Sequence, residues 1–156
     1  MHLLLDEMLK KTAKWLRIFG IDTEFIEGKK DSELIDYATK NNLIFITKDE
    51  ELANRCRKQK INYLLLKSEK IAEQLREIKS SLALEFKFPE QTRCPSCNES
   101  LKLVDKEKVS ALVPENVLKS QEKFWLCEKC NKAYWQGSHW RNITKIYEGA
   151  NKILSS

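Results

Sequence analysis

Short apolar runs alternate with amphipathic stretches along the first ninety residues. The runs are typical of strands that a parallel sheet buries on both faces, and they cover residues 2–5, 23–26, 43–46 and 63–66. The stretches between and after them have apolar positions at helical spacing, and they cover residues 8–19, 32–40, 50–58 and 68–79. Strands that alternate with helices predict a parallel sheet with right-handed crossovers, so we expect an α/β fold.

The first predicted helix is amphipathic. Its apolar residues Met8, Trp15 and Phe19 fall on one face, which we expect to be the buried one. Gly20 is expected to end the helix as its C′ residue. The opposite face carries three basic residues, which are Lys10, Lys14 and Arg17.

A change of composition at residues 89–92 marks the end of the α/β part. We therefore predict two domains, an α/β domain over residues 1–89 and a small domain with a C-terminal tail over residues 90–156. The last element of the first domain is expected to be an edge strand over residues 82–88, closed by Pro89. In the second domain a final helix is predicted from about Trp140 to Leu154.

The net charge of +5 is unevenly distributed along the chain. Residues 1–90 contain 17 Lys and Arg against 16 Asp and Glu, whereas residues 91–156 contain 11 against 7. This mild basicity is compatible with nucleic acid as a partner but does not identify one. We expect no membrane span and no signal peptide, and therefore a cytoplasmic protein.

Two C-x-x-C pairs, Cys94 with Cys97 and Cys127 with Cys130, occur in the second domain. Thiols stay reduced in the cytosol, where paired cysteines favour metal over disulfides. Each pair can form a tight turn that points two thiolates at one ion, so together they predict a zinc ribbon with four cysteine ligands. A closed shell of four thiolates makes this zinc structural. Redox-active dithiols are the alternative, but those usually lie at a helix start within the α/β unit.

Asparagine follows the second cysteine of each pair, as Asn98 and Asn131. That position often needs a positive φ, which Asn tolerates better than most residues. The 29 residues between the pairs exceed the usual spacing, so we expect an inserted hairpin or short helix around residues 109–117. The fifth cysteine, Cys56, lies on a predicted helix and is interpreted as a buried apolar residue.

Three aspartates lie at the ends of predicted elements: Asp6 and Asp49 follow the first and third strands, and Asp31 precedes the second helix. Ligands of open parallel sheets bind beyond the carboxyl ends of the strands, so these side chains are expected to converge. Gathered carboxylates suit a hard divalent ion, Mg²⁺ or Mn²⁺. Helix capping is an equally good interpretation, because Asp is a leading N-cap residue and Thr47 with Glu50 fits a capping box.

Six segments give nearly the whole chain a resemblance to a known family. The α/β part has DEML at 6–9, WLRIFG at 15–20, DSEL at 31–34 and TKDEEL at 47–52. The cysteine-containing part has RCPSCN at 93–98 and YWQGSH at 134–139. In this order, over about residues 1–143, they resemble the Mut-seven C-terminal ribonuclease domain family.

The resemblance implies a PIN-like domain followed by a zinc ribbon, with metal-dependent endoribonuclease activity. Asp6, Asp31 and Asp49 match the acidic positions of the family. In this interpretation they hold the Mg²⁺ or Mn²⁺ ion that activates water for phosphodiester hydrolysis. RNA is then the expected partner, with ribosomal and transfer RNA as candidate classes.

Two groups of side chains are candidates for RNA contact. Lys10 and Arg17 on the first helix, and Lys48 beside Asp49, can attract the phosphate backbone, with an ordinary solvated face as the alternative. Residues after the last cysteine suit stacking on unpaired bases, and packing of the ribbon on the α/β domain is the alternative for their rings. This second group comprises Tyr134, His139, Trp140 and Arg141, with Trp135 expected to pack.

Two other hypotheses stay open. PIN nucleases often have a fourth acidic position later in the domain, and no Asp occurs between Glu50 and Glu90. An inactive RNA- or ribosome-binding protein is therefore one alternative. A phospho-receiver-like regulator is the other, because acidic residues after strands one and three also describe that fold, but the α/β part is short for it.

Overall fold

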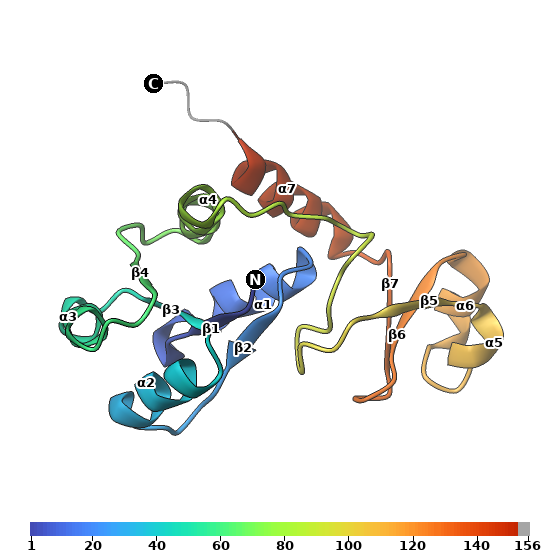
Figure 1. Cartoon of the computed structure of the whole chain (residues 1–156). Coiled ribbons are helices and arrows are strands. Elements are labelled where there is room, and N and C mark those ends of the chain that lie inside the picture. The colour runs from blue at the N-terminus through green and yellow to red at the C-terminus, as the bar shows by residue number, and fades with distance from the viewer. Residues whose placement is uncertain (153–156) are drawn as a thin grey trace.

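A four-stranded parallel sheet forms the centre of the N-terminal part in the computed structural model, which describes residues 1–152. Its order is β2-β1-β3-β4. The central strand β1 pairs with both neighbours in register, so that Leu5 lies opposite Phe25 and Ile46. The carboxyl ends of the strands therefore meet at one edge of the sheet (Figure 1). The strands are β1 (Leu3–Leu5), β2 (Thr23–Phe25), β3 (Ile44–Thr47) and β4 (Tyr63–Leu65).

Helices cover both faces of this sheet, which confirms the predicted α/β class. The side chains of β1 alternate between the faces. Leu3 and Leu5 are buried with the helices α1 and α4, whereas Leu4 is buried with α2 and α3. The helices are η1 (Glu7–Leu9), α1 (Lys10–Ile18), α2 (Asp31–Lys40), α3 (Glu50–Lys58) and α4 (Ile71–Leu82). Cys56 is fully buried on α3, as expected.

The first helix differs from its predicted pattern at both ends. A turn of 3-10 helix precedes α1, and it leaves Met8 72% exposed instead of buried. Arg17, predicted on the polar face, is only 7% exposed. Gly20 follows the helix with a φ of 89°, which agrees with its expected role at the C-terminus.

The edge strand predicted over residues 82–88 does not form. Helix α4 ends at Ala83, which adopts a left-handed conformation with a φ of 51°. The chain then crosses the end of α1, where Lys87 donates its backbone N–H to the carbonyl of Phe19. Phe86 is buried against that helix, so apolar packing rather than strand pairing holds this segment.

A small antiparallel sheet with the order β5-β6-β7 forms a second lobe, and we call residues 90–139 the ribbon lobe. Its strands are β5 (Lys102–Val104), β6 (Phe124–Cys127) and β7 (Lys132–Trp135). The long segment between the cysteine pairs forms two short helices, α5 (Lys106–Val109) and α6 (Glu115–Ser120), rather than a hairpin. They cover a core of Val109, Val113 and Phe124.

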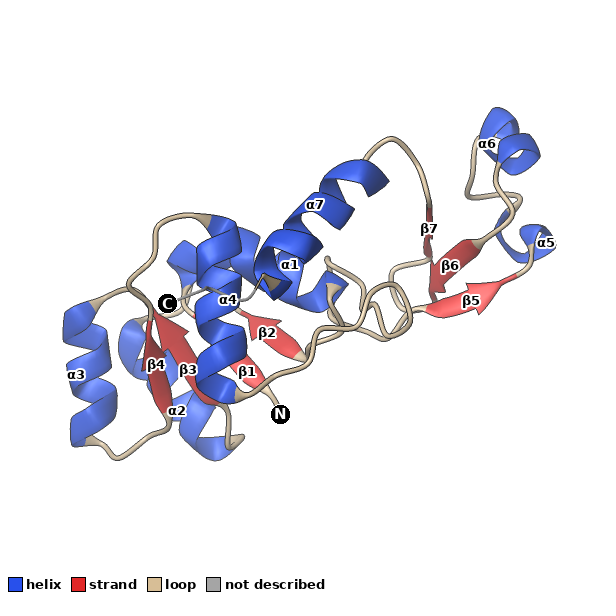
Figure 2. Cartoon of the chain, turned by 90° about the horizontal axis from the view of Figure 1, so that it is seen from above, coloured by secondary structure: helices blue, strands red, loops and turns tan. Residues whose placement is uncertain are grey.

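The last helix, α7 (Trp140–Asn151), returns from the ribbon lobe to the α/β part and lies beside α4 (Figures 1 and 2). Ala150 is buried in the same core as α1 and α4, and the hydroxyl of Tyr147 donates to the carbonyl of Phe86 at 3.0 Å. The predicted end of this helix at Leu154 lies outside the described residues. None of the helices in residues 1–152 has the length and apolar character that a membrane span requires.

Candidate metal centre and candidate active site

The four paired cysteines of the ribbon lobe gather at one point. Their Sγ atoms all lie within 4.8 Å of one another, and Cys97 and Cys127 approach to 3.4 Å. Cys94 and Cys127 are fully buried. Four convergent sulfur ligands are the donor set of a structural zinc ion, so the site fits zinc.

The two asparagines that follow the cysteine pairs adopt the expected left-handed backbone. Asn98 has a φ of 74° and Asn131 a φ of 54°, which confirms the prediction. Asn98 also joins the first cysteine turn to the start of β2. Its Nδ2 donates to Asp22 Oδ1 at 2.6 Å, and its Oδ1 accepts the backbone N–H of Thr23 at 3.0 Å.

Arg17 forms a second connection between the cysteine turn and the α/β part. Its Nε donates to the carbonyl of Thr23 and its Nη1 to the carbonyl of Pro95, both at 2.8 Å. Burial lowers the pKa of its guanidinium, and the nearby thiols of Cys94 and Cys97 act in the opposite direction. These contacts give Arg17 a structural position between the lobes rather than the exposed one that contact with RNA requires.

The protonation of the thiols shows why a cation suits this site. Burial alone raises the pKa of Cys94, but hydrogen bonds from the Tyr134 hydroxyl and from backbone amides lower it to about 7. A hydrogen bond with Cys97, together with burial, raises the pKa of Cys130 to about 12. Four thiolates so close together repel one another, and a bound zinc ion offsets that repulsion. Tyr134, with its hydroxyl 3.3 Å from Cys94 Sγ, is thus a neighbour of the metal ligands.

Asp6 lies at the carboxyl edge of the parallel sheet and is only 6% exposed. Its backbone N–H continues the sheet by donating to the carbonyl of Ile46 at 2.9 Å. Burial raises the pKa of the Asp6 carboxyl, a hydrogen bond from Thr47 acts against it, and the charges of Asp31 and Asp49 raise it slightly further. The three aspartates are therefore electrostatic neighbours.

Thr47, at the end of β3, connects two of these aspartates. Its hydroxyl donates to Asp6 Oδ2 at 2.8 Å and accepts the backbone N–H of Asp49 at 3.0 Å. The predicted capping box of Thr47 and Glu50 is therefore wrong, because the N-cap of α3 is Asp49 and the Thr47 hydroxyl serves Asp6 instead.

Helix capping, the alternative interpretation, applies to one aspartate of the three. Asp49 Oδ1 accepts the backbone N–H groups of Glu51 and Leu52 at 2.9 and 3.2 Å, so capping occupies one of its two oxygens. Asp6 forms no such bond within η1, and Asp31 is the first residue of α2 rather than its N-cap. Among residues 1–152 the three carboxylates do not form a group as tight as the four thiols.

Charged side chains surround the acidic edge. Lys10 pairs with Glu27 at 2.6 Å, Arg55 lies 4.0 Å from Asp31, and Lys48 pairs with Glu69. Sequence reasoning missed Glu69, which follows β4 and supplies a late carboxylate at the same edge. The signal is present in the sequence, because Glu69 follows the fourth apolar run as Asp6 and Asp49 follow the first and third.

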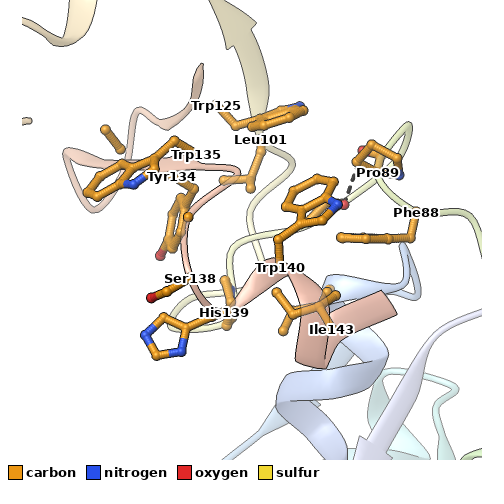
Figure 3. Close-up of a pocket in the computed structure, with 15 residues that line it drawn as sticks. Phe88, Pro89, Leu101, Trp125, Tyr134, Trp135, Ser138, His139, Trp140 and Ile143 are labelled. Atoms are coloured by element: carbon orange, nitrogen blue, oxygen red, sulfur yellow. Dashed lines mark hydrogen bonds between the residues drawn. The ribbon is translucent and has the colours of Figure 1, made fainter. Parts of the chain in front are cut away.

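The aromatic residues after the last cysteine line a cavity of about 460 Å³ between the ribbon lobe, α1 and α7 (Figure 3). The ring of Trp140 packs against Phe88, with centroids 4.8 Å apart, and stacks on Trp125 at 5.8 Å. Tyr134 and Trp135 lie across the cavity from Trp140, whereas His139 and Arg141 are exposed. Trp140 thus contacts both parts of the chain while its ring borders the cavity.

Comparison with known proteins gives one match. A family model described as "Mut7-C RNAse domain" matches residues 1–147, which include the parallel sheet, the ribbon lobe and most of α7. No curated protein and no solved structure matches the chain.

Proposed function

Because the chain belongs to the Mut7-C RNAse domain family, we propose that it is a PIN-like, metal-dependent endoribonuclease that hydrolyses phosphodiester bonds of RNA. The observation that carries this proposal is the hydrogen-bonded connection of Asp6 and Asp49 through Thr47 at the carboxyl edge of the sheet. That edge is where open parallel sheets bind their ligands.

The donor set fits a hard divalent cation. Asp6 is buried near the charges of Asp31 and Asp49, and its pKa is raised. A bound cation would stabilise its ionised form by offsetting the negative charge. Asp6 and Asp49 would hold Mg²⁺ or Mn²⁺, with Asp31 as a further ligand or as the group that orients water. When bound, such an ion supplies a water of lowered pKa and stabilises charge on the phosphate.

The remaining parts support this chemistry from a distance. Thr47 fixes the orientation of Asp6. Lys10 and Lys48 lie beside the edge, where they pair with Glu27 and Glu69 and can exchange these partners for RNA phosphates. The zinc site of the ribbon lobe has no open position, so its role is to hold the RNA-binding aromatic segment. Ribosomal and transfer RNA are the candidate substrate classes. A cytoplasmic location belongs to the same proposal, because cysteines stay reduced there and can hold zinc.

The test is cleavage of labelled single-stranded and structured RNAs by the wild type, Asp6→Asn and Asp49→Asn in Mn²⁺ or Mg²⁺. We expect cleavage to need a divalent ion and to fall about 100-fold or more in both variants. Asp36→Asn, an exposed change on α2, is the matched control and should cleave normally. Equal cleavage by all four proteins would refute the assignment. Tight RNA binding without cleavage by the wild type would favour an inactive RNA-binding protein.

A further inference from the structure

The aromatic cavity has the size and lining of a ligand site. Its volume of about 460 Å³ is within the range of about 300–1,000 Å³ that small-molecule sites have. Indole and phenol rings of Trp125, Trp135, Trp140 and Tyr134 form its walls, and Ser138 and His139 add polar groups at its border (Figure 3). Ring faces beside a few exposed polar groups are what an unpaired nucleobase needs, namely stacking and hydrogen bonds to its edge.

Positive charge lies on one side of this cavity. A wider depression of about 740 Å³ shares Gly137, Ser138 and Trp140 with it. The charged residues of that depression are the exposed cations Arg141 and Lys145 and the exposed Glu148, so two positive charges stand against one negative charge. A base in the cavity would carry a phosphate on each side, and these cations lie where one of them can be bound.

Helix α1 connects the border of the cavity with the acidic edge. Ile18, in the last turn of α1, lines the cavity. A third depression of about 340 Å³ shares Pro95 with it, and its charged lining residues are Lys10, Lys14, Arg17 and Glu27. Lys10 begins α1 a few residues after Asp6, and Ile18 is eight residue steps further along the helix, or about 12 Å. A few nucleotides of single-stranded RNA can cover that distance.

We propose that the aromatic cavity binds one unpaired base of the RNA substrate, a few nucleotides from the phosphate that is cleaved. The base stacks on the rings of the cavity, Arg141 and Lys145 attract the backbone on one side, and Lys14 and Lys10 guide it toward Asp6 on the other. The position of the cut is then set by the distance between the cavity and the acidic edge. The position of the cut rests on the proposed function, whereas binding of the base does not depend on catalysis.

A scan with single abasic nucleotides tests the proposal. Binding of single-stranded RNAs is measured by fluorescence anisotropy without added Mg²⁺ or Mn²⁺, with one base removed at each position in turn. We expect one position, or two neighbours, at which removal weakens binding about tenfold. In Mn²⁺, the same substitution should slow the cut that lies a constant few nucleotides away.

A variant that fills the cavity provides the second arm. Ser138→Leu places an apolar side chain at an exposed border position, and Ser120→Leu is the matched exposed change elsewhere in the ribbon lobe. Only Ser138→Leu should weaken RNA binding about tenfold and lose the position dependence of the abasic scan. Zinc content and circular dichroism verify that both variants fold.

The two proposals fail in different ways. A flat abasic scan, or equal binding by the two serine variants, with cleavage intact in the wild type, would overturn the base-binding cavity and leave the nuclease standing. A position-dependent scan in a protein that never cleaves would leave the cavity and overturn the nuclease.

Discussion

The hydroxyl of Thr47 donates to Asp6 Oδ2 at 2.8 Å, within a part of the sheet where both residues are almost completely buried. The same hydroxyl accepts the backbone N–H of Asp49. One small side chain therefore sets the orientation of a buried carboxylate and the start of helix α3. The ends of β1 and β3 are coupled through this atom.

Thr47→Val should weaken both folding and catalysis. The change keeps the shape of the side chain but removes the hydroxyl that serves the Asp49 N–H and Asp6 Oδ2. The free energy of unfolding, measured in urea, should fall by about 1–2 kcal/mol. Because the Thr47 hydrogen bond lowers the pKa of Asp6, its loss should also move the acid limb of the cleavage profile to higher pH. Thr47→Ser is the control, and identical pH profiles for the Val and Ser variants would contradict the predicted orienting role.

Asp6→Asn should stabilise the metal-free protein at neutral pH. Burial raises the pKa of the Asp6 carboxyl in the folded chain above its ordinary value of 3.8. At a pH between the unfolded and the folded pKa, the folded chain retains a proton that the unfolded chain releases. Stability contributed by this group therefore falls as the pH rises through that window. The Asn variant lacks this loss and should be about 1 kcal/mol more stable at neutral pH.

Urea unfolding at acid and neutral pH measures this difference, with Asp36→Asn as the exposed control. Added Mn²⁺ should raise the melting temperature of the wild type more than that of Asp6→Asn, because the variant lacks one of the carboxylates that bind the ion. A variant less stable than wild type at neutral pH would show that the Asp6 charge is not a cost to the fold.

Arg17→Met should loosen the junction between the lobes. Methionine retains the apolar stem but removes the two hydrogen bonds to Thr23 and Pro95, at an expected cost of about 3 kcal/mol. Zinc should be lost faster to a chromophoric chelator, because a cation near Cys94 and Cys97 is removed. Lys11→Met, an exposed change on the same helix, is the control. Equal rates of zinc release from the two variants would show that Arg17 holds the lobes together but does not help to retain zinc.

Removal of zinc should unfold the ribbon lobe before the parallel sheet. The lobe has a core of few residues, and its cysteines hold β6 to the turn at Cys94. Hydrogen exchange should show loss of protection in β5, β6 and β7 while β1 and β3 stay protected. RNA binding should weaken about tenfold or more. Unchanged RNA affinity in the zinc-free protein would show that the folded ribbon lobe does not contribute to RNA binding.

Sequence patterns were sufficient for features set by local chemistry. The cysteine spacing predicted the cluster, and the Asn98 and Asn131 conformations followed from the turn that such a pair must form. Apolar runs predicted the parallel sheet, since strands covered on both faces need no polar positions. The proximity of Asp6 and Asp49 followed from the sheet rule alone.

Features set by contacts between the lobes could not be predicted from the sequence. Arg17 has helical spacing with Lys10 and Lys14, and nothing local indicates that a cysteine turn covers it. Residues 82–88 have strand-like composition, but the end of α1 offers Phe86 a better burial than the sheet edge does. Trp140 could not be assigned to packing or binding, because it contributes to both an interior contact and a cavity wall.

The contact between Phe88 and Trp140 has a topological consequence. The chain leaves the α/β part at Phe88 and re-enters it at Trp140, and the two rings are 4.8 Å apart. The ribbon lobe is therefore a loop whose two stems touch, so closing it costs the α/β part little chain entropy. A short turn in place of residues 90–139 would bridge this gap and leave α7 docked on α4. Such a minimal chain would present the same acidic edge with no lobe beside it.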